Sequence, residues 1–127
     1  MYKIITNKEL YNWALNNFNV FKELEQLVLP VSVGYKYIYN KTLIFNLIYQ
    51  IEDLRKEIIK KYGKIDEDGH YKFESNEFLQ KANEEIQLIL EEKQELKLKS
   101  FTLKDLKDIS LTIKQIEVLS LMISEEE

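Results

Sequence analysis

Apolar residues recur at steps of three and four along residues 7–27 of this chain. Such spacing places them on one face of a helix, so we predict an amphipathic helix over this segment. Thr6 and Glu9 have capping-box spacing at its start, and Pro30 follows its end. The residues predicted to face the core are Leu10, Trp13, Ala14, Leu15, Phe18, Phe21, Leu24 and Leu27.

A second apolar pattern begins after Pro30. Its first part, residues 31–39, alternates as a strand does, but it runs directly into a stripe with helical spacing between Ile44 and Ile58. We therefore favour a helix over a strand for residues 31–39. A helix over residues 32–62 is about 45 Å long at 1.5 Å per residue, which makes it the expected spine of the fold.

A hairpin and a third helix are predicted next. Residues 64–65 and 71–73 are β-prone and flank a polar turn with Gly, which is typical of a small hairpin. Ser75 or Asn76 is placed to cap the helix that follows. The apolar positions on one face of that helix are Leu79, Ala82, Ile86 and Ile89.

The last third of the chain is predicted to contain a strand and two short helices. The alternation over residues 95–99 indicates a half-buried strand, which we expect to pair with residues 2–5. Thr102 and Thr112 each stand at a capping position that predicts a helix start. In the last helix, the residues expected to face inward are Ile116, Leu119, Met122 and Ile123.

Together these elements predict an α+β fold that is predominantly α-helical, with a long central helix, about four other helices and a minor short-stranded sheet. A chain of 127 residues is long enough for one core and too short for two ordinary domains. We divide the single domain 1–127 into a helical part (7–62), a hairpin region (63–74), a helix–strand–helix part (75–124) and an acidic tail (125–127).

The composition excludes several classes of protein. Without Cys the chain has no disulfide, no thiolate nucleophile and no cysteine zinc site, and one His is too few for most histidine metal centres. No apolar stretch approaches the ~20 residues of a membrane span, and the N-terminus lacks the apolar run of a signal peptide. We expect a cytoplasmic protein with no membrane partner.

The net charge of −4 is unevenly distributed along the chain. Residues 1–63 carry eight Lys and one Arg against six acids, a net +3, whereas residues 64–127 carry nine Lys against sixteen acids, a net −7. No acid occurs between Glu25 and Glu52. The candidate interaction surface in that window is Tyr35, Lys36, Tyr37, Tyr39 and Lys41.

Three interpretations of these tyrosines remain open. Their rings can line the rim of the core, anchor a protein interface, or stack on single-stranded bases. On a helix the three cannot share one face, so at least one is expected to be exposed. Because only one of the 18 basic residues is Arg, the side chain best suited to phosphate and base contacts, nucleic acid is the least favoured partner.

The second half of the chain contains a candidate acidic surface but no recognisable catalytic site. The turn around His70 lacks the EF-hand spacing, because His70 and Tyr71 stand where an oxygen ligand and Gly are needed, so we favour a solvated turn over a metal site. No Gly-x-Ser-x-Gly motif or phosphate-binding loop occurs. We expect no enzymatic activity and no cofactor. The acidic candidates are Asp66, Glu67, Asp68, Glu84, Glu85, Glu91 and Glu92.

Short motifs along nearly the whole chain resemble those of small proteins of unknown function encoded by phages and prophages of low-GC Gram-positive bacteria. The motifs are Ile5-Thr6-Asn7 with Glu9-Leu10, Leu29-Pro30-Val31 with Tyr35, Lys61-Tyr62-Gly63 leading to Asp66-Glu67-Asp68-Gly69, Leu96 to Leu98, Leu103 with Asp105-Leu106, and Leu111-Thr112. The resemblance implies action inside a bacterial host cell and supplies no catalytic residues.

Three functions are compatible with these features. The first is a protein-binding accessory factor, acting on a host defence effector as an inhibitor of a nuclease such as a CRISPR effector. Its acidic half would compete for a basic nucleic-acid groove. The second is a phage structural or virion-associated protein that self-associates through the long helix, which makes a homo-oligomer an open alternative. The third is a weak single-stranded nucleic-acid binder.

Overall fold

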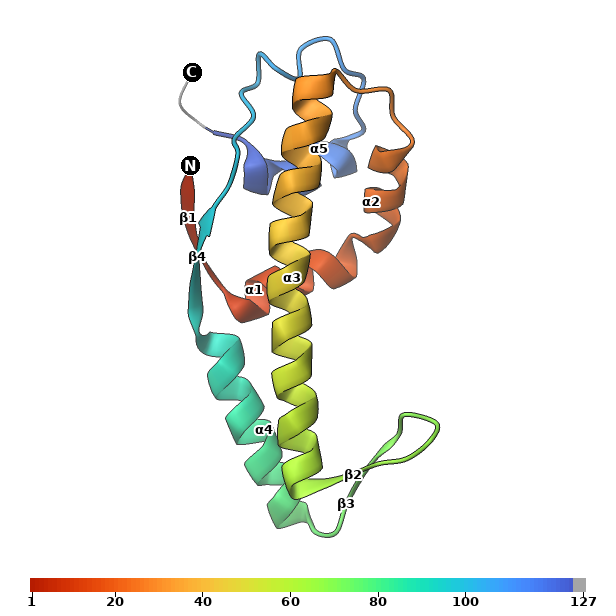
Figure 1. Cartoon of the computed structure of the whole chain (residues 1–127), viewed down its shortest axis with the longest axis vertical. Helices are drawn as coiled ribbons and strands as arrows, with labels where there is room; N and C mark the ends of the chain where they lie inside the picture. The colour runs from red at the N-terminus through yellow and green to blue at the C-terminus, as the bar shows by residue number, and fades with distance from the viewer. Residues whose placement is uncertain (125–127) are drawn as a thin grey trace.

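The longest element is the 32-residue helix α3 (Val31–Tyr62) of the computed structural model, which describes residues 1–124 (Figure 1). At 1.5 Å per residue α3 is about 48 Å long, and it runs along nearly the whole molecule. Pro30 precedes its first turn. A backbone N–H at this position would have no acceptor within the helix, so the N–H that proline lacks costs no helical hydrogen bond. The prediction of a helix for residues 31–39 is confirmed.

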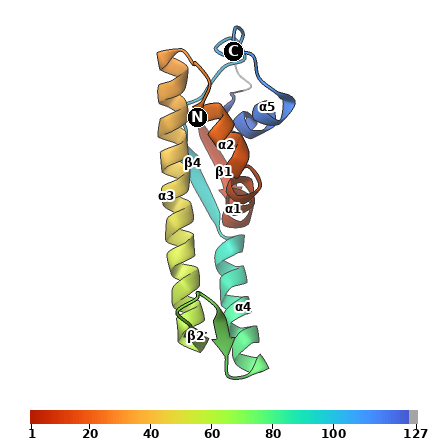
Figure 2. The same cartoon turned by 90° about the vertical axis from the view of Figure 1, so that its right-hand side faces the viewer.

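The other elements lie on one side of α3, so the molecule has two layers (Figure 2). Helices α2 (Phe18–Glu25) and α5 (Ile113–Leu119) stand beside its N-terminal half, α1 (Asn7–Asn16) lies at its middle, and α4 (Asn76–Glu91) packs along its C-terminal half. A 3₁₀ turn, Ser120–Met122, follows α5. Within residues 1–124, the five α-helices and two small sheets confirm the predicted α+β fold that is mainly helical.

The first strand joins the start of the chain to its last third. β1 (Tyr2–Thr6) pairs antiparallel with β4 (Lys93–Lys97), and Ile4 lies opposite Glu95. The predicted pairing is confirmed, although the strand begins two residues before the predicted 95–99. The N-terminal segment is therefore fixed to the rest of the molecule by a backbone ladder.

β2 (Gly63–Ile65) and β3 (Tyr71–Phe73) form the predicted hairpin directly after α3. Gly63 is needed there, because a Cβ at this position would lie 2.4 Å from the backbone oxygen of Lys72. The turn between the strands contains Gly69 at φ 81°, in the left-handed region that favours glycine. The hairpin projects from the end of α3 (Figure 1).

Predicted caps fix the starts of three helices. The hydroxyl oxygens of Thr6, Ser75 and Thr112 each accept from a backbone N–H three residues further on, at 3.1, 3.2 and 3.1 Å. At Thr112 the side chain of Gln115 accepts in return from the Thr112 N–H at 3.0 Å, which completes a capping box. The predicted starts of α1, α4 and α5 are confirmed.

The hydrophobic core lies between the N-terminal half of α3 and the second layer. Burying side chains of this kind contributes about 1.5 to 3 kcal/mol each, so the core-facing side of α3, rather than helix propensity alone, holds this long helix in place. The largest fully buried apolar side chains are Phe101, Leu10, Leu24, Ile44, Leu96, Met122 and Val118.

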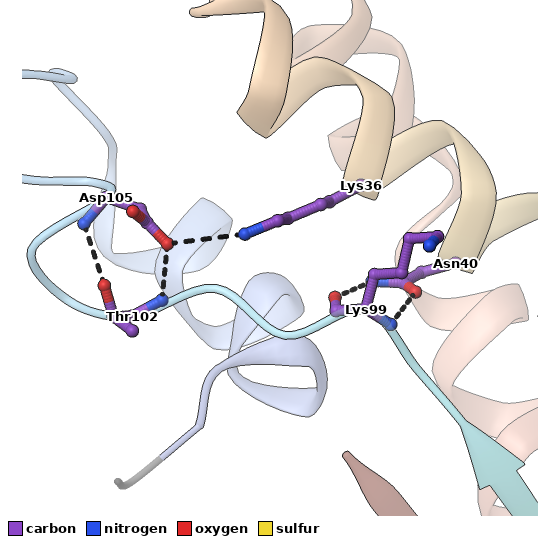
Figure 3. A network of polar contacts seen from close by, with 5 residues as sticks. All are labelled: Lys36, Asn40, Lys99, Thr102 and Asp105. Atoms are coloured by element: carbon purple, nitrogen blue, oxygen red, sulfur yellow. Dashed lines mark hydrogen bonds and ion pairs between the residues drawn. The ribbon is translucent and has the colours of Figure 1, made fainter. Parts of the chain in front are cut away.

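A buried amide joins α3 to the chain that leaves β4. Asn40 is 0% exposed, and its Nδ2 donates to the Lys99 carbonyl at 2.7 Å while its Oδ1 accepts from the Lys99 N–H at 2.8 Å (Figure 3). The side chain thus meets both backbone groups of Lys99, as a neighbouring strand would. It holds the segment between two buried residues, Leu98 and Phe101.

A second polar contact lies next to this amide (Figure 3). Lys36 Nζ lies 3.8 Å from Asp105 Oδ2, and the same oxygen accepts from the Thr102 N–H at 2.9 Å. The Asp105 N–H donates to the Thr102 hydroxyl at 3.1 Å. These hydrogen bonds hold the pKa of the Asp105 carboxyl below its usual value, the backbone bond at Thr102 being the largest cause.

The predicted single helix over residues 7–27 is wrong in one respect, because the chain breaks between α1 and α2. Asn17 Nδ2 donates to the Trp13 carbonyl at 2.8 Å, so its side chain engages a helical acceptor, and its own backbone leaves the helical region at φ −120°, ψ 16°. The break turns α2 relative to α1. As a result Phe18, predicted to face the core, is exposed. Leu15, also predicted to face the core, is exposed within α1, where Leu10 and Ala14 are on the buried face.

The predicted short helix after Thr102 is also wrong, because residues 103–108 form successive tight turns. Their backbone bonds run over three residues, as from Leu106 N to Leu103 O at 3.2 Å. Phe101 and Leu106 both enter the core, so the chain between them must turn back too sharply for an α-helix.

The inward face of the last helix also differs from the prediction. Val118 is buried, whereas Ile116, predicted to face inward, is exposed. The buried face of α5 is formed by Gln115, Val118 and Leu119 instead, and Gln115 is the residue that completes the capping box with Thr112.

Replacing Asn40 by Ala is expected to lower the free energy of unfolding by about 2 kcal/mol or more, because two backbone groups of Lys99 lose their partner. The matched control is Asn46→Ala, an exposed amide on the same helix, for which a change below about 0.5 kcal/mol is expected. Urea unfolding followed by circular dichroism measures both. Equal losses in the two variants would contradict the role given to Asn40.

Candidate functional site

The side of α3 away from the core carries an apolar stripe, which is exposed along most of its length and partly buried at Phe45, where it packs against Phe21 of α2. We call it the α3 seam, and its members follow one another at steps of four and three residues: Val31, Tyr35, Ile38, Thr42, Phe45 and Tyr49. Val31 is 88% exposed, Ile38 63% and Tyr49 61%. Eighteen residues make five full helical turns, so Val31 and Tyr49 lie on one line along the helix.

The same face changes character after Tyr49. Its next exposed residues are Asp53, Lys56 and Lys60, which are charged as expected for a helix surface in water. The apolar character of the seam is therefore confined to about five turns of α3. Contiguous exposed apolar side chains of this kind mark interaction surfaces.

A groove of about 710 Å³ borders the seam, and we call it the α2–α3 groove. Phe18 and Lys22 of α2 form one wall, and Ile38, Phe45 and Tyr49 of α3 form the other. Such a groove between two helices, lined mainly by apolar and aromatic groups, is suited to an apolar side chain or to one face of a helix.

A chain of aromatic rings connects the groove to the core. The ring centroids of Trp13 and Phe21 are 4.9 Å apart, those of Phe21 and Phe45 are 5.6 Å apart, and those of Phe45 and Tyr49 are 6.3 Å apart. Trp13 is fixed in turn by its indole N–H, which donates to the Val118 carbonyl at 3.2 Å. The groove wall is therefore held in place before any partner binds.

The two lysines predicted to supply positive charge are both paired within the chain. Lys41 forms an ion pair with Glu25 at the rim of the groove, and its ammonium group lies 5.6 Å from the centre of the Phe45 ring. Lys36 pairs with Asp105. Neither lysine offers an unpaired cation for a phosphate, so the surface is apolar more than basic.

The three tyrosines of the predicted interaction surface separate as expected for a helix. Tyr35 and Tyr39 are exposed, and the ammonium group of Lys99 lies 5.7 and 4.7 Å from the centres of their rings. Tyr37 is only 4% exposed, so its inclusion in the interaction surface is wrong, because its position shares the core-facing side of α3 with Val33.

The buried Tyr37 hydroxyl lies under the groove. Among residues 1–124 it has no hydrogen-bond partner, and burial, together with the nearby Glu25 carboxylate, raises its pKa. The phenol therefore stays protonated at neutral pH, and Tyr37 lies beneath the groove, buried among the residues that line it.

The acidic candidates do not form one surface. Asp66, Glu67 and Asp68 lie in the turn of the hairpin, while the remaining four lie along α4 and at its end. Lys61 Nζ lies 3.1 Å from Glu85 Oε1, because α4 packs beside the basic C-terminal end of α3. The tail 125–127 lies outside the described residues.

Asp66, Asp68 and His70 bring three potential metal-ligand atoms within 4.8 Å of one another. All three side chains are exposed, and Asp66 Oδ1 already accepts from the backbone N–H groups of Asp68 and His70 at 2.9 and 2.8 Å. These bonds close the turn that contains Gly69. We assign Asp66 a structural role in that turn.

Sequence reasoning included only Tyr35 of the seam in the interaction surface. It missed Phe18 of the groove wall and the seam residues Val31, Ile38, Thr42, Phe45 and Tyr49. Phe18 was assigned to the core because the break at Asn17 could not be seen in the spacing. Ile38 belongs to a regular step of three and four from Val31 to Tyr49, a signal that the stronger alternation over residues 31–39 obscured.

No family model, curated protein or solved structure matches this chain. The resemblance to phage proteins therefore stays a prediction made from the sequence motifs. Within residues 1–124, every helix is too short or too polar to cross a membrane.

A half-buried polar cluster next to the groove predicts sensitivity to high pH. Tyr11 donates its hydroxyl to Glu52, and burial and this bond raise the pKa of the phenol to about 12 from 10.0. The unfolded chain loses the phenolic proton first, so the contribution of Tyr11 to the free energy of unfolding should be constant at about pH 8 to 9 and fall as the pH rises through 10 towards 12.

Urea unfolding between pH 8 and 12 measures this decline, which should be shallower in Tyr11→Phe than in the wild type. The buried Tyr37 phenol retains part of the decline in the variant, because its pKa is also raised. Parallel curves for the two proteins would show that Tyr11 makes no contribution.

Proposed function

We propose that this protein is a non-enzymatic accessory factor that binds another protein through the α3 seam and the α2–α3 groove. The observation that carries the proposal is the exposed apolar seam from Val31 to Tyr49, on a helix whose outer side no other element of residues 1–124 covers (Figure 2). Exposure of the Val31 and Ile38 side chains to water is unfavourable, and a partner that covers these side chains gains the free energy of burying them.

The seam has the composition of a binding centre. Tyr is enriched at the residues that dominate interface energetics, and Tyr35 and Tyr49 present their rings near the two ends of the seam. Because α3 is fixed on its other side by the core, its outer side chains lose little backbone freedom when a partner binds.

The paired lysines favour protein over nucleic acid as the partner. Single-strand binders combine stacking rings with free cations that follow the backbone. Here Lys36 and Lys41 are engaged by Asp105 and Glu25. A phosphate would have to displace a carboxylate at each lysine.

A narrower proposal concerns the identity of the bound protein. The resemblance to phage-encoded proteins supports a host defence effector, such as a CRISPR nuclease, that is inhibited when this chain occupies part of its surface. The scattered acidic residues of α4 and the hairpin make charge mimicry a minor contribution, so the apolar seam is assigned the main contact.

Photo-cross-linking in bacterial cells tests the general proposal. A benzophenone amino acid in place of Tyr49 is expected to give one dominant protein adduct, whereas the same group in place of Leu88 gives none. Leu88 is a suitable control because it is 67% exposed but lies on α4, away from the seam. Absence of an adduct at position 49, or equal adducts at both positions, would show that the seam is not a binding surface.

A cleavage assay tests the narrower proposal. The wild-type protein should slow target cleavage by a purified CRISPR nuclease, and Ile38→Glu should need at least about tenfold more protein for the same effect, because it places a charge in the middle of an apolar contact. Leu88→Glu should inhibit like the wild type. If the wild type inhibits no such nuclease, the defence-inhibitor proposal is wrong.

A further inference from the structure

We infer that, in the isolated protein, a second copy of this chain covers the α3 seam and that the two α3 helices pack antiparallel about a two-fold axis near residue 40. The inference rests on the proposed function, because it names an occupant for the same face. It is argued from the spacing, the order of side-chain sizes and the charges of the seam.

The seam is straight enough to receive a second helix. From Val31 to Tyr49 its steps are four, three, four, three and four residues, which average 3.6, the period of a straight α-helix. Over these 18 residues the seam extends for about 27 Å at 1.5 Å per residue. A straight partner helix of equal length can therefore follow it from end to end.

The order of side-chain sizes favours an antiparallel register. With the axis near residue 40, Val31 of one copy meets Tyr49 of the other, and Ile38 meets Thr42. In both layers a smaller side chain faces a larger one, which is the condition for close packing. The middle layer places Tyr35 against Phe45, an aromatic pair.

A parallel register fits less well. It would place Tyr49 against Tyr49 and Tyr35 against Tyr35, while Thr42 faced Thr42 and left the middle of the seam thinly packed. Large residues would then hold the helices apart where the small ones need contact. The same six residues are self-complementary only when the chains run in opposite directions.

The charges beside the axis also suit a second copy. Lys41 flanks the centre of the seam, so two copies bring two ammonium groups together, but each is already paired with Glu25. The two Lys41 ammonium groups and the two Glu25 carboxylates then alternate in sign, so the repulsion between the ammonium groups is offset by attraction to the carboxylates. On the other flank Tyr39 is uncharged, and the excess acids of the chain lie in residues 64–127, outside the seam.

Self-association through the seam makes binding of any other protein depend on concentration. A heterologous partner has to displace the second copy, so its apparent affinity is highest when the chain is dilute. Dimerisation would in this way limit the activity of the protein when it is abundant.

Sedimentation equilibrium tests the dimer directly. The wild type is expected to shift with concentration from 15.3 kDa towards twice that mass, as is Leu88→Glu. Ile38→Glu should remain at the monomer mass with an unchanged circular dichroism spectrum, since Ile38 is exposed and makes no core contact that folding requires. A wild type that stays monomeric at roughly 1 mM, or an Ile38→Glu variant that still dimerises, would overturn the inference.

Cysteine cross-linking tests the register. The chain has no Cys, so Val31→Cys and Tyr49→Cys each carry a single thiol. A short bismaleimide should link a mixture of the two variants into dimers and leave each variant alone largely unlinked. Linking of each variant to itself would indicate a parallel pair and would overturn the antiparallel arrangement.

The photo-cross-linking experiment separates failure of this inference from failure of the proposed function. An adduct at position 49 with a second copy supports the dimer. A monomeric wild type that still gives an adduct with a different protein overturns the dimer but leaves the protein-binding function in place. A monomer without any adduct removes both.

Discussion

The contact between Asn40 and Lys99 determines how this chain is assembled. One amide side chain satisfies both backbone groups of Lys99, at 2.7 and 2.8 Å, and thereby fastens the segment that follows β4 to the N-terminal half of α3 (Figure 3). Because β4 also pairs with β1, the N-terminal strand is attached to α3 through the same contact. Leu96 and Phe101, on either side of it, are both buried in the core.

This anchoring leaves α3 with two dissimilar sides. Residues from three separate parts of the chain cover the side that contains Asn40, whereas no other helix or strand of residues 1–124 lies over the outer side of α3 (Figure 2). At the edge of the seam, Phe45 packs against Phe21 of α2. The division into a basic and an acidic half, visible along the sequence, is lost at the other end of the molecule, where α4 brings Glu85 against Lys61. The apolar residues of the seam, in contrast, lie together on one surface of the folded chain.

The spacing of the apolar residues, the helix caps and the turn residues predicted much of the fold, because each of these signals depends on residues that lie close together in the sequence. The helix α3, the hairpin and the pairing of β1 with β4 followed from them. The break at Asn17 did not, since it depends on one side chain engaging the carbonyl of Trp13. Nor could the sequence show that Lys41 is neutralised, because its partner Glu25 lies 16 residues away and meets it only after α2 turns back along α3.

The ring chain behind the groove gives the molecule an optical reporter of its own. Trp13 is the only tryptophan in the sequence, and it touches Phe21, which touches Phe45 and through it Tyr49 at the surface. Because the indole packs against Phe21 and lies three ring contacts from Tyr49, a partner that shifts the rings of the groove wall would change the surroundings, and so the emission, of this tryptophan. Occupancy of the surface can therefore be followed in the unlabelled protein.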